Sequence, residues 1–152
     1  MAKTPKTYRI PGLGLEIMSN SVKDEGGWHE LRSKLENEAD ERKLASQIEK
    51  MFPGEGWRLP TLPELKLMGK LAELGLDINL ATQDHYNYYQ PIISSDELDT
   101  KIRGKAKACL RCVRTPSAVS PDNPDGVHCV IITQNGSGIG AYPPLVRLVR
   151  DI

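Results

Sequence analysis

Apolar residues follow a period of two near the start of the chain and a helical period in its middle. Across residues 8–18, apolar side chains alternate with Gly or Glu, which predicts short extended segments. Across residues 28–52 they recur every three or four positions, which predicts helix up to Pro53-Gly54. The spacing slips near Asp40, so the pattern leaves open one bent helix or two helices.

A second helix has clear end signals. Thr61 is followed by Pro63 in the first turn and by Glu64 three residues after the cap, an arrangement typical of a capping box. Leucines, Met68 and alanine give this helix one apolar face, and Gly75 is the expected stop.

The second half of the chain favours strands. Alternating or strongly apolar runs predict strands at 92–95, 105–114, 127–134, 139–142 and 145–150. Asn135-Gly136 is typical of a tight hairpin turn, so the tail is expected to be mostly antiparallel sheet. Two helices followed by antiparallel strands predict an α+β class.

Composition bounds the function without naming it. The 152 residues carry 20 basic and 20 acidic side chains and 39% apolar residues, which fits one globular domain spanning 1–152 and excludes collagen-like or disordered chains. A balanced charge indicates no partner, and we expect neither a membrane span nor nucleic-acid binding as the main role. No apolar stretch follows the basic N-terminus, so we expect no secretory signal. The location stays open: the cytoplasm, a virion or appendage, or a surface reached by another route.

The string Gly56-Trp57-Arg58-Leu59-Pro60-Thr61, followed by Glu64-Leu65, is the most specific in the chain. It resembles the "GWRLPT" signature of a bacterial domain family of collagen-like adhesins and surface proteins, which has the C-type-lectin-like fold. Weaker matches in the same order lie at 15–18, 28, 93–97, 136–142 and 145–151. The resemblance implies two helices packed on a curled antiparallel sheet, with long loops at 80–98 and 115–126 as contact regions.

The chain departs from that family at several positions. Ile93 stands where the family has an aromatic residue, Leu148 stands where it has Cys, and the usual helix cysteine is missing. We therefore expect no disulfide from the first helix to the last strand, and no exported location on that account. The signature itself has a structural interpretation, because Trp57 can anchor a strand-to-helix corner and Arg58 can pair with an acid or carbonyl across it.

Three cysteines invite a chemical interpretation. Cys109, Cys112 and Cys129, with His128, are soft zinc ligands, but residues three apart on a strand point to opposite faces. Redox work by Cys-x-x-Cys favours a helix N-terminus, which this segment lacks. An odd number of cysteines indicates no disulfide framework, so we expect buried free thiols, no resident metal or cofactor, and no catalytic motif.

A tyrosine-rich segment is the main candidate for ligand binding. Asp84, His85, Tyr86, Tyr88 and Tyr89 fall together, and tyrosine offers flat apolar area with a hydroxyl at little entropic cost. A core role for one or two of the rings stays open. Carboxylates and amides at 121–125 also leave calcium open, although ordinary turns have the same composition.

A basic stretch is the second candidate. Lys105 and Lys107 lie in a run of six cations without an acid, Lys101 to Arg114, and the odd positions would share one strand face. Such a face could bind an anionic polymer, or it could protect an edge strand from pairing, which is the interpretation we favour.

These patterns together predict a non-catalytic binding or structural module. We expect the protein to be displayed on a surface, appendage or virion and to contact a protein or glycan partner through its loops. The sequence leaves open whether it forms a homo-oligomer. The alternative is an intracellular metal-binding or redox protein that uses Cys109, Cys112 and Cys129.

Overall fold

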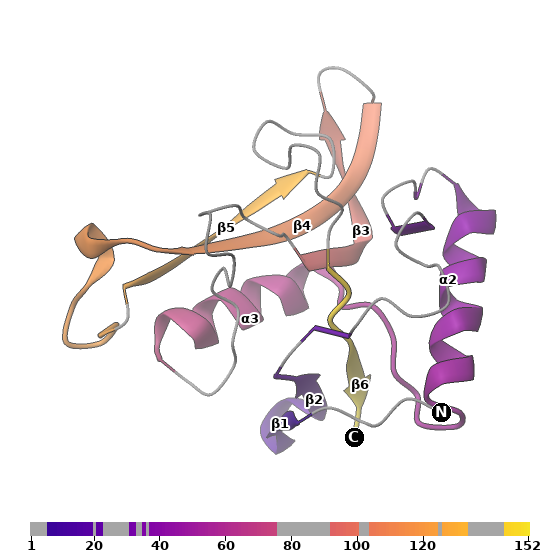
Figure 1. Ribbon diagram of the computed structural model, residues 1–152, viewed down its shortest axis with the longest axis horizontal. Helices are drawn as coiled ribbons and strands as arrows, with labels where there is room; N and C mark the ends of the chain where they lie inside the picture. Colours follow the sequence, from indigo (N-terminus) through magenta and orange to yellow (C-terminus); the bar gives the residue numbers. More distant parts are fainter. Residues whose placement is uncertain are drawn as a thin grey trace.

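The computed structural model describes residues 6–19, 21–22, 31–32, 35, 37–75, 92–100, 104–124, 126–133 and 145–152. In this part of the chain the strands form two antiparallel sheets of three strands each, with two helices beside them (Figure 1). The α+β class is thus confirmed. The strands do not form one curled sheet as expected, because they divide into two groups.

The first sheet joins the two ends of the described chain. It has the order β1-β2-β6, with β1 at Thr7–Ile10, β2 at Leu15–Met18 and β6 at Val149–Asp151. A 3-10 turn at Pro11–Leu13 connects β1 to β2. The predicted extended segments are therefore present, but all four residues of β2 are buried and do not alternate. Leu15 and Ile17 pack in one apolar cluster and Met18 packs in the other, while Glu16 accepts a hydrogen bond from Arg150.

The second sheet is longer and has the order β3-β4-β5. These strands span Ile92–Thr100, Gly104–Arg114 and Val127–Thr133, and a 3-10 turn at Pro116–Ala118 follows β4. The predicted strands at 105–114 and 127–134 are confirmed to within one residue, whereas the strand predicted at 92–95 continues to Thr100. The predicted strand at 139–142 lies outside the described residues.

Each face of the second sheet belongs to a different apolar cluster. Leu110 and Cys112 pack in the cluster that contains residues of α3, whereas Cys109 packs in the cluster that contains Leu44 and Ile48 of α2. In Figure 1, α3 runs along one face of this sheet and α2 stands to one side. Opposite side-chain directions at positions three apart confirm the strand interpretation of the Cys109–Cys112 segment.

Both helices begin at caps that the sequence encodes. Helix α2, Glu38–Met51, starts after Asn37, whose side-chain oxygen accepts from the backbone N–H groups of Ala39 and Asp40. Leu31 and Arg32 are helical but Leu35 is not, so the run breaks before Asn37, earlier than the predicted position. Helix α3, Leu62–Glu73, has the predicted capping box at Thr61 and is followed by Gly75 with φ of 76°.

Within the described part of the chain, no helix is both long enough and apolar enough to cross a membrane.

Candidate functional site

The corner between α2 and α3 is built around a buried tryptophan. Gly56, with φ of 80°, allows the chain to turn immediately before Trp57, which is almost fully buried. The Trp57 indole Nε1 donates to a carboxylate oxygen of Glu55 at 3.2 Å. The Arg150 guanidinium lies 4.4 Å from the centroid of the ring, so the last strand closes one face of the indole.

Arg58 joins the corner to both neighbouring elements. Its Nη1 and Nη2 donate to the two Glu64 carboxylate oxygens at 2.7 and 2.9 Å, and Nη2 also donates to Asp151 at 3.1 Å. Hydrogen bonding to Glu64 raises the pKa of Arg58 against the opposing effect of burial. The same bonds from Arg58 hold the pKa of Glu64 below its ordinary value. The predicted pairing of Arg58 with an acid across the corner is confirmed.

Backbone hydrogen bonds hold the corner between the two sheets. Arg58 and Val149 exchange two N–H to carbonyl bonds of 2.9 Å, which adds the corner to β6. Pro60 accepts from the Ser95 N–H at 2.9 Å, and Asp96 accepts from the first N–H of α3, that of Leu62, at 2.6 Å. The corner is therefore rigidly placed relative to α3, β3 and β6.

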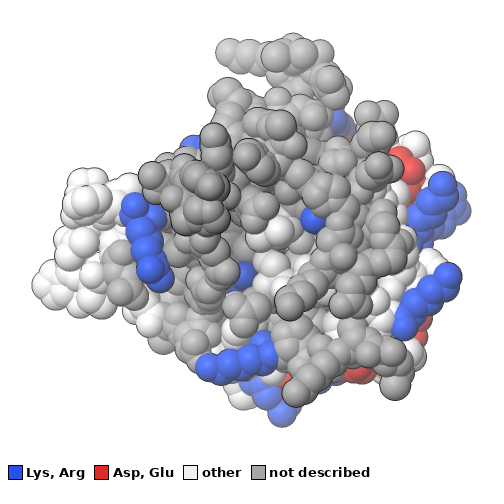
Figure 2. All heavy atoms as spheres, viewed as in Figure 1, with Lys and Arg blue, Asp and Glu red and all other residues white. Residues whose placement is uncertain are grey.

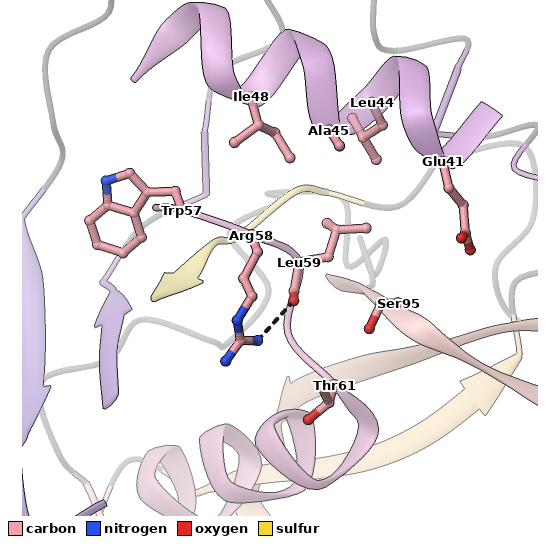
Figure 3. Close-up of a pocket in the computed structure, with 9 residues that line it drawn as sticks. All are labelled: Glu41, Leu44, Ala45, Ile48, Trp57, Arg58, Leu59, Thr61 and Ser95. Carbon is pink, nitrogen blue, oxygen red and sulfur yellow. Dashed lines mark hydrogen bonds between the residues drawn. The ribbon is translucent and has the colours of Figure 1, made fainter. Parts of the chain in front are cut away.

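A pocket of about 340 Å³ lies between this corner and α2. Figure 3 shows the side chains of Leu44, Ala45 and Ile48 extending from α2 towards the corner segment, with Thr61 and Ser95 on the far side. The described lining is completed by Glu41, Trp57, Arg58 and Leu59. Its volume is within the range of small-ligand and side-chain pockets.

The lining is mainly apolar, and two of its polar side chains, those of Thr61 and Arg58, are engaged within the protein. The Thr61 hydroxyl accepts from the Glu64 N–H, and the Arg58 guanidinium is held by Glu64 and Asp151. Ala45 is exposed at the pocket and therefore contributes to its mouth, whereas Leu44 and Ile48 are buried. The pocket thus offers apolar contact area more than free hydrogen-bonding groups.

A buried lysine lies next to the pocket. The Lys107 ammonium donates to the backbone oxygen of Ser95 at 2.9 Å, forms an ion pair with Glu41, and lies 3.7 Å from a carboxylate oxygen of Glu97. Burial lowers the pKa of Lys107. Two residues that line the pocket, Glu41 and Ser95, therefore also hold this ammonium.

These contacts correct the interpretation of the basic stretch. Lys105 is exposed but Lys107 is buried, so the cations do not share one open face. The edge-strand interpretation is wrong as well, because β4 is the central strand between β3 and β5. On the face seen in Figure 2, the described basic side chains lie at separate places and not in one patch. Lys101 and Arg103 lie outside the described residues.

The tyrosine-rich candidate cannot be placed. Asp84, His85, Tyr86, Tyr88 and Tyr89 all lie outside the described residues, so their role stays a prediction. The same holds for most of the expected contact region at 80–98. In the other expected contact region, 115–126, residues 116, 117, 119–122 and 124 are exposed, whereas Gly126 is buried. Val119 is largely open to solvent.

The cysteines differ from expectation in one respect. Cys112 of β4 and Cys129 of β5 are direct cross-strand partners and form a disulfide, whereas both had been expected as free thiols. Cys109 is the free buried thiol, and burial raises its pKa to about 12. Within the described ranges, no group of three or more His, Cys, Asp or Glu is arranged to hold a metal ion.

Comparisons with protein-family models, with curated proteins and with solved structures found no match for the chain. The site is therefore argued from its own geometry.

Sequence reasoning missed the pocket although it found the corner. Glu41, Ala45 and Ile48 belong to the run 28–52, which the sequence predicts only as helix. Their periodicity gives the side of α2 that faces the protein, but it does not show that α2 and the corner leave space between them.

Proposed function

We propose that the chain is a non-catalytic binding module of the C-type-lectin-like type, and that its pocket beside the corner receives an apolar side chain of a partner protein. The observation that carries this proposal is the combination of a rigid corner with an adjacent apolar pocket. Binding energy at protein interfaces concentrates in a few large side chains that fill such pockets.

Two features of the fold support the type of module. The Gly56–Leu65 string forms a corner that leads into α3, as its residues predict, and two helices lie beside antiparallel strands. The corner is held by Glu64, Asp96 and Val149, which leaves little freedom to lose on binding.

The lining favours a protein side chain over a glycan. A sugar presents many hydroxyl groups, which need free donors and acceptors around the whole ring, whereas Arg58, Thr61 and Lys107 beside this pocket are engaged within the protein. Trp57 is buried, and Arg150 covers one face of its ring, so this face of the indole is not available for stacking on a sugar. An aliphatic or aromatic side chain requires only the apolar surface.

The disulfide supports display outside a reducing compartment. Disulfides persist in secreted proteins and on virion or cell surfaces, and they are rare in reducing cytosol. The Cys112–Cys129 bond also engages two of the three thiols on which the alternative metal-binding role depends. We therefore favour surface, appendage or virion display over an intracellular metal protein.

Selection from a displayed random-peptide library tests the proposal. Ala45→Phe would fill the mouth of the pocket, and Ser46→Phe places the same ring on the next exposed position of α2, which does not line the pocket. We expect enriched peptides to share one large apolar residue and to lose binding to Ala45→Phe but not to Ser46→Phe. Peptides that bind the wild type and both variants equally would contradict the proposal, provided that both variants show the wild-type circular dichroism spectrum.

A further inference from the structure

At each of the two ends of the pocket, the ion-paired groups include more carboxylates than cations. At one end, Lys107 is shared by Glu41 and Glu97. At the other end, Arg58 is shared by Glu64 and Asp151. Each end thus holds one cation and two carboxylates, so these six groups together carry two excess negative charges.

At the Lys107 end, the carboxylates face solvent and the cation does not. The side chain of Lys107 is 3% exposed, whereas those of Glu41 and Glu97 are 40% and 45% exposed. The ammonium already holds Ser95 and Glu41, and Glu97 lies beyond hydrogen-bond distance at 3.7 Å. The Glu97 carboxylate can therefore accept further hydrogen bonds, and it lies beside an apolar pocket.

The Arg58 end is less favourable for an incoming cation. Its guanidinium is itself about one-third exposed, and Glu64 is engaged by two hydrogen bonds from Arg58 and one from the Thr61 backbone. A cation approaching this end would meet the partly exposed Arg58 side chain, whereas the Lys107 side chain at the other end is buried.

We propose that the partner segment carries a basic side chain next to its apolar anchor, and that this basic group pairs with Glu97 and Glu41 at the end of the pocket. This inference rests on the proposed function, because it concerns the same pocket. Apolar contact would hold the anchor, and charge complementarity would fix its orientation and exclude acidic segments.

Three small probes with the same ring and chain test the charge preference. They are 3-phenylpropylamine, 3-phenylpropan-1-ol and 3-phenylpropanoate, each titrated into the protein at pH 7 while the NMR signals of the pocket methyl groups are followed. Because both carboxylates are half-exposed, we expect the amine to bind about two- to fivefold more tightly than the alcohol, and the carboxylate more weakly than the alcohol. Added salt should reduce these differences.

Two variants test whether the preference for the amine comes from Glu97. Glu97→Gln should reduce the advantage of the amine while leaving the affinity of the alcohol within about twofold of wild type. Asp122→Asn, which neutralises an exposed acid on the turn after β4, should leave all three affinities unchanged. A preference for the amine that survives Glu97→Gln would overturn the assignment to this end of the pocket.

The outcomes separate the two proposals. Equal affinities for the three probes, with binding abolished by Ala45→Phe, would overturn the charge preference and leave the pocket proposal standing. Tightest binding of the carboxylate would also overturn it, because a cation beside the pocket would then be the recognised group. If Ala45→Phe leaves binding of every probe unchanged, or no probe binds, the pocket proposal fails together with the inference drawn from it.

Discussion

Arg58 and Glu64 form a two-bond ion pair across the corner, with N to O distances of 2.7 and 2.9 Å. Glu64 also accepts from the Thr61 backbone N–H at 2.8 Å, so one carboxylate closes the capping box of α3 and fixes the chain before it. This relationship connects the most specific string of the sequence to the placement of the pocket wall.

Removing the Glu64 carboxylate should destabilise the fold through two separate losses, that of the cap hydrogen bond and that of the ion pair with Arg58. We expect Glu64→Ala to lower the free energy of unfolding by about 1–2 kcal/mol, because both the cap bond and the ion pair are lost. Glu64→Gln should cost about 0.5–1 kcal/mol, because its amide oxygen can still accept from Thr61. Urea unfolding followed by tryptophan fluorescence measures both values, and equal losses in the two variants would contradict a separate contribution of the charge.

The same carboxylate should make stability depend on pH. Because the pKa of Glu64 is lowered in the folded protein from its ordinary 4.5, its contribution is present above that value and is lost as pH falls through the lowered folded pKa. We therefore expect the stability difference between wild type and Glu64→Gln to shrink as the pH falls below the ordinary value of 4.5. A difference that grows on acidification would show that the sign of the pKa shift is wrong.

The disulfide should be measurable by thiol counting and by its effect on stability. Of the three cysteines, only Cys109 should react with a thiol reagent in unfolded, unreduced protein, and all three should react after reduction. The bond closes a loop between positions 17 apart, so reduction should cost about 3 kcal/mol of unfolding free energy. Three reactive thiols without reductant, in protein isolated from an oxidising compartment, would contradict the bond.

Gly126 should not tolerate a side chain. It has φ of 65°, and an added Cβ would overlap the Thr115 carbonyl oxygen and lie 2.9 Å from Cγ2 of Val119. We expect Gly126→Ala to cost about 3 kcal/mol or more, from backbone strain and overpacking together. Gly54→Ala is the matched control, because Gly54 has φ of 73° and no atom within 4 Å of the added Cβ, and it should cost about 1 kcal/mol. Similar melting temperatures for the two variants would contradict the clash.

Local signals in the sequence predicted local structure well. The capping box at Thr61, the stop at Gly75 and the pairing of Arg58 across the corner involve residues close together in the chain, whose chemistry restricts the backbone directly. The alternation in 105–114 likewise gave the strand and the opposite directions of Cys109 and Cys112.

Features that depend on distant residues were not predictable in this way. Lys107 is buried because the backbone of Ser95 and the carboxylate of Glu41 hold its ammonium, and a period of two does not show which distant residues will lie there. The Cys112–Cys129 bond depends on the register between β4 and β5, which the turn at 115–126 determines. The pocket requires the separation between α2 and the corner, which neither segment encodes alone.

The account depends most on the occupant of the pocket between α2 and the corner. A crystal structure of the protein with a peptide selected as described above measures this directly. We predict that the shared apolar side chain of the peptide lies among Leu44, Ile48 and Leu59. A complex in which the peptide binds another surface and this pocket holds no part of it would contradict the account.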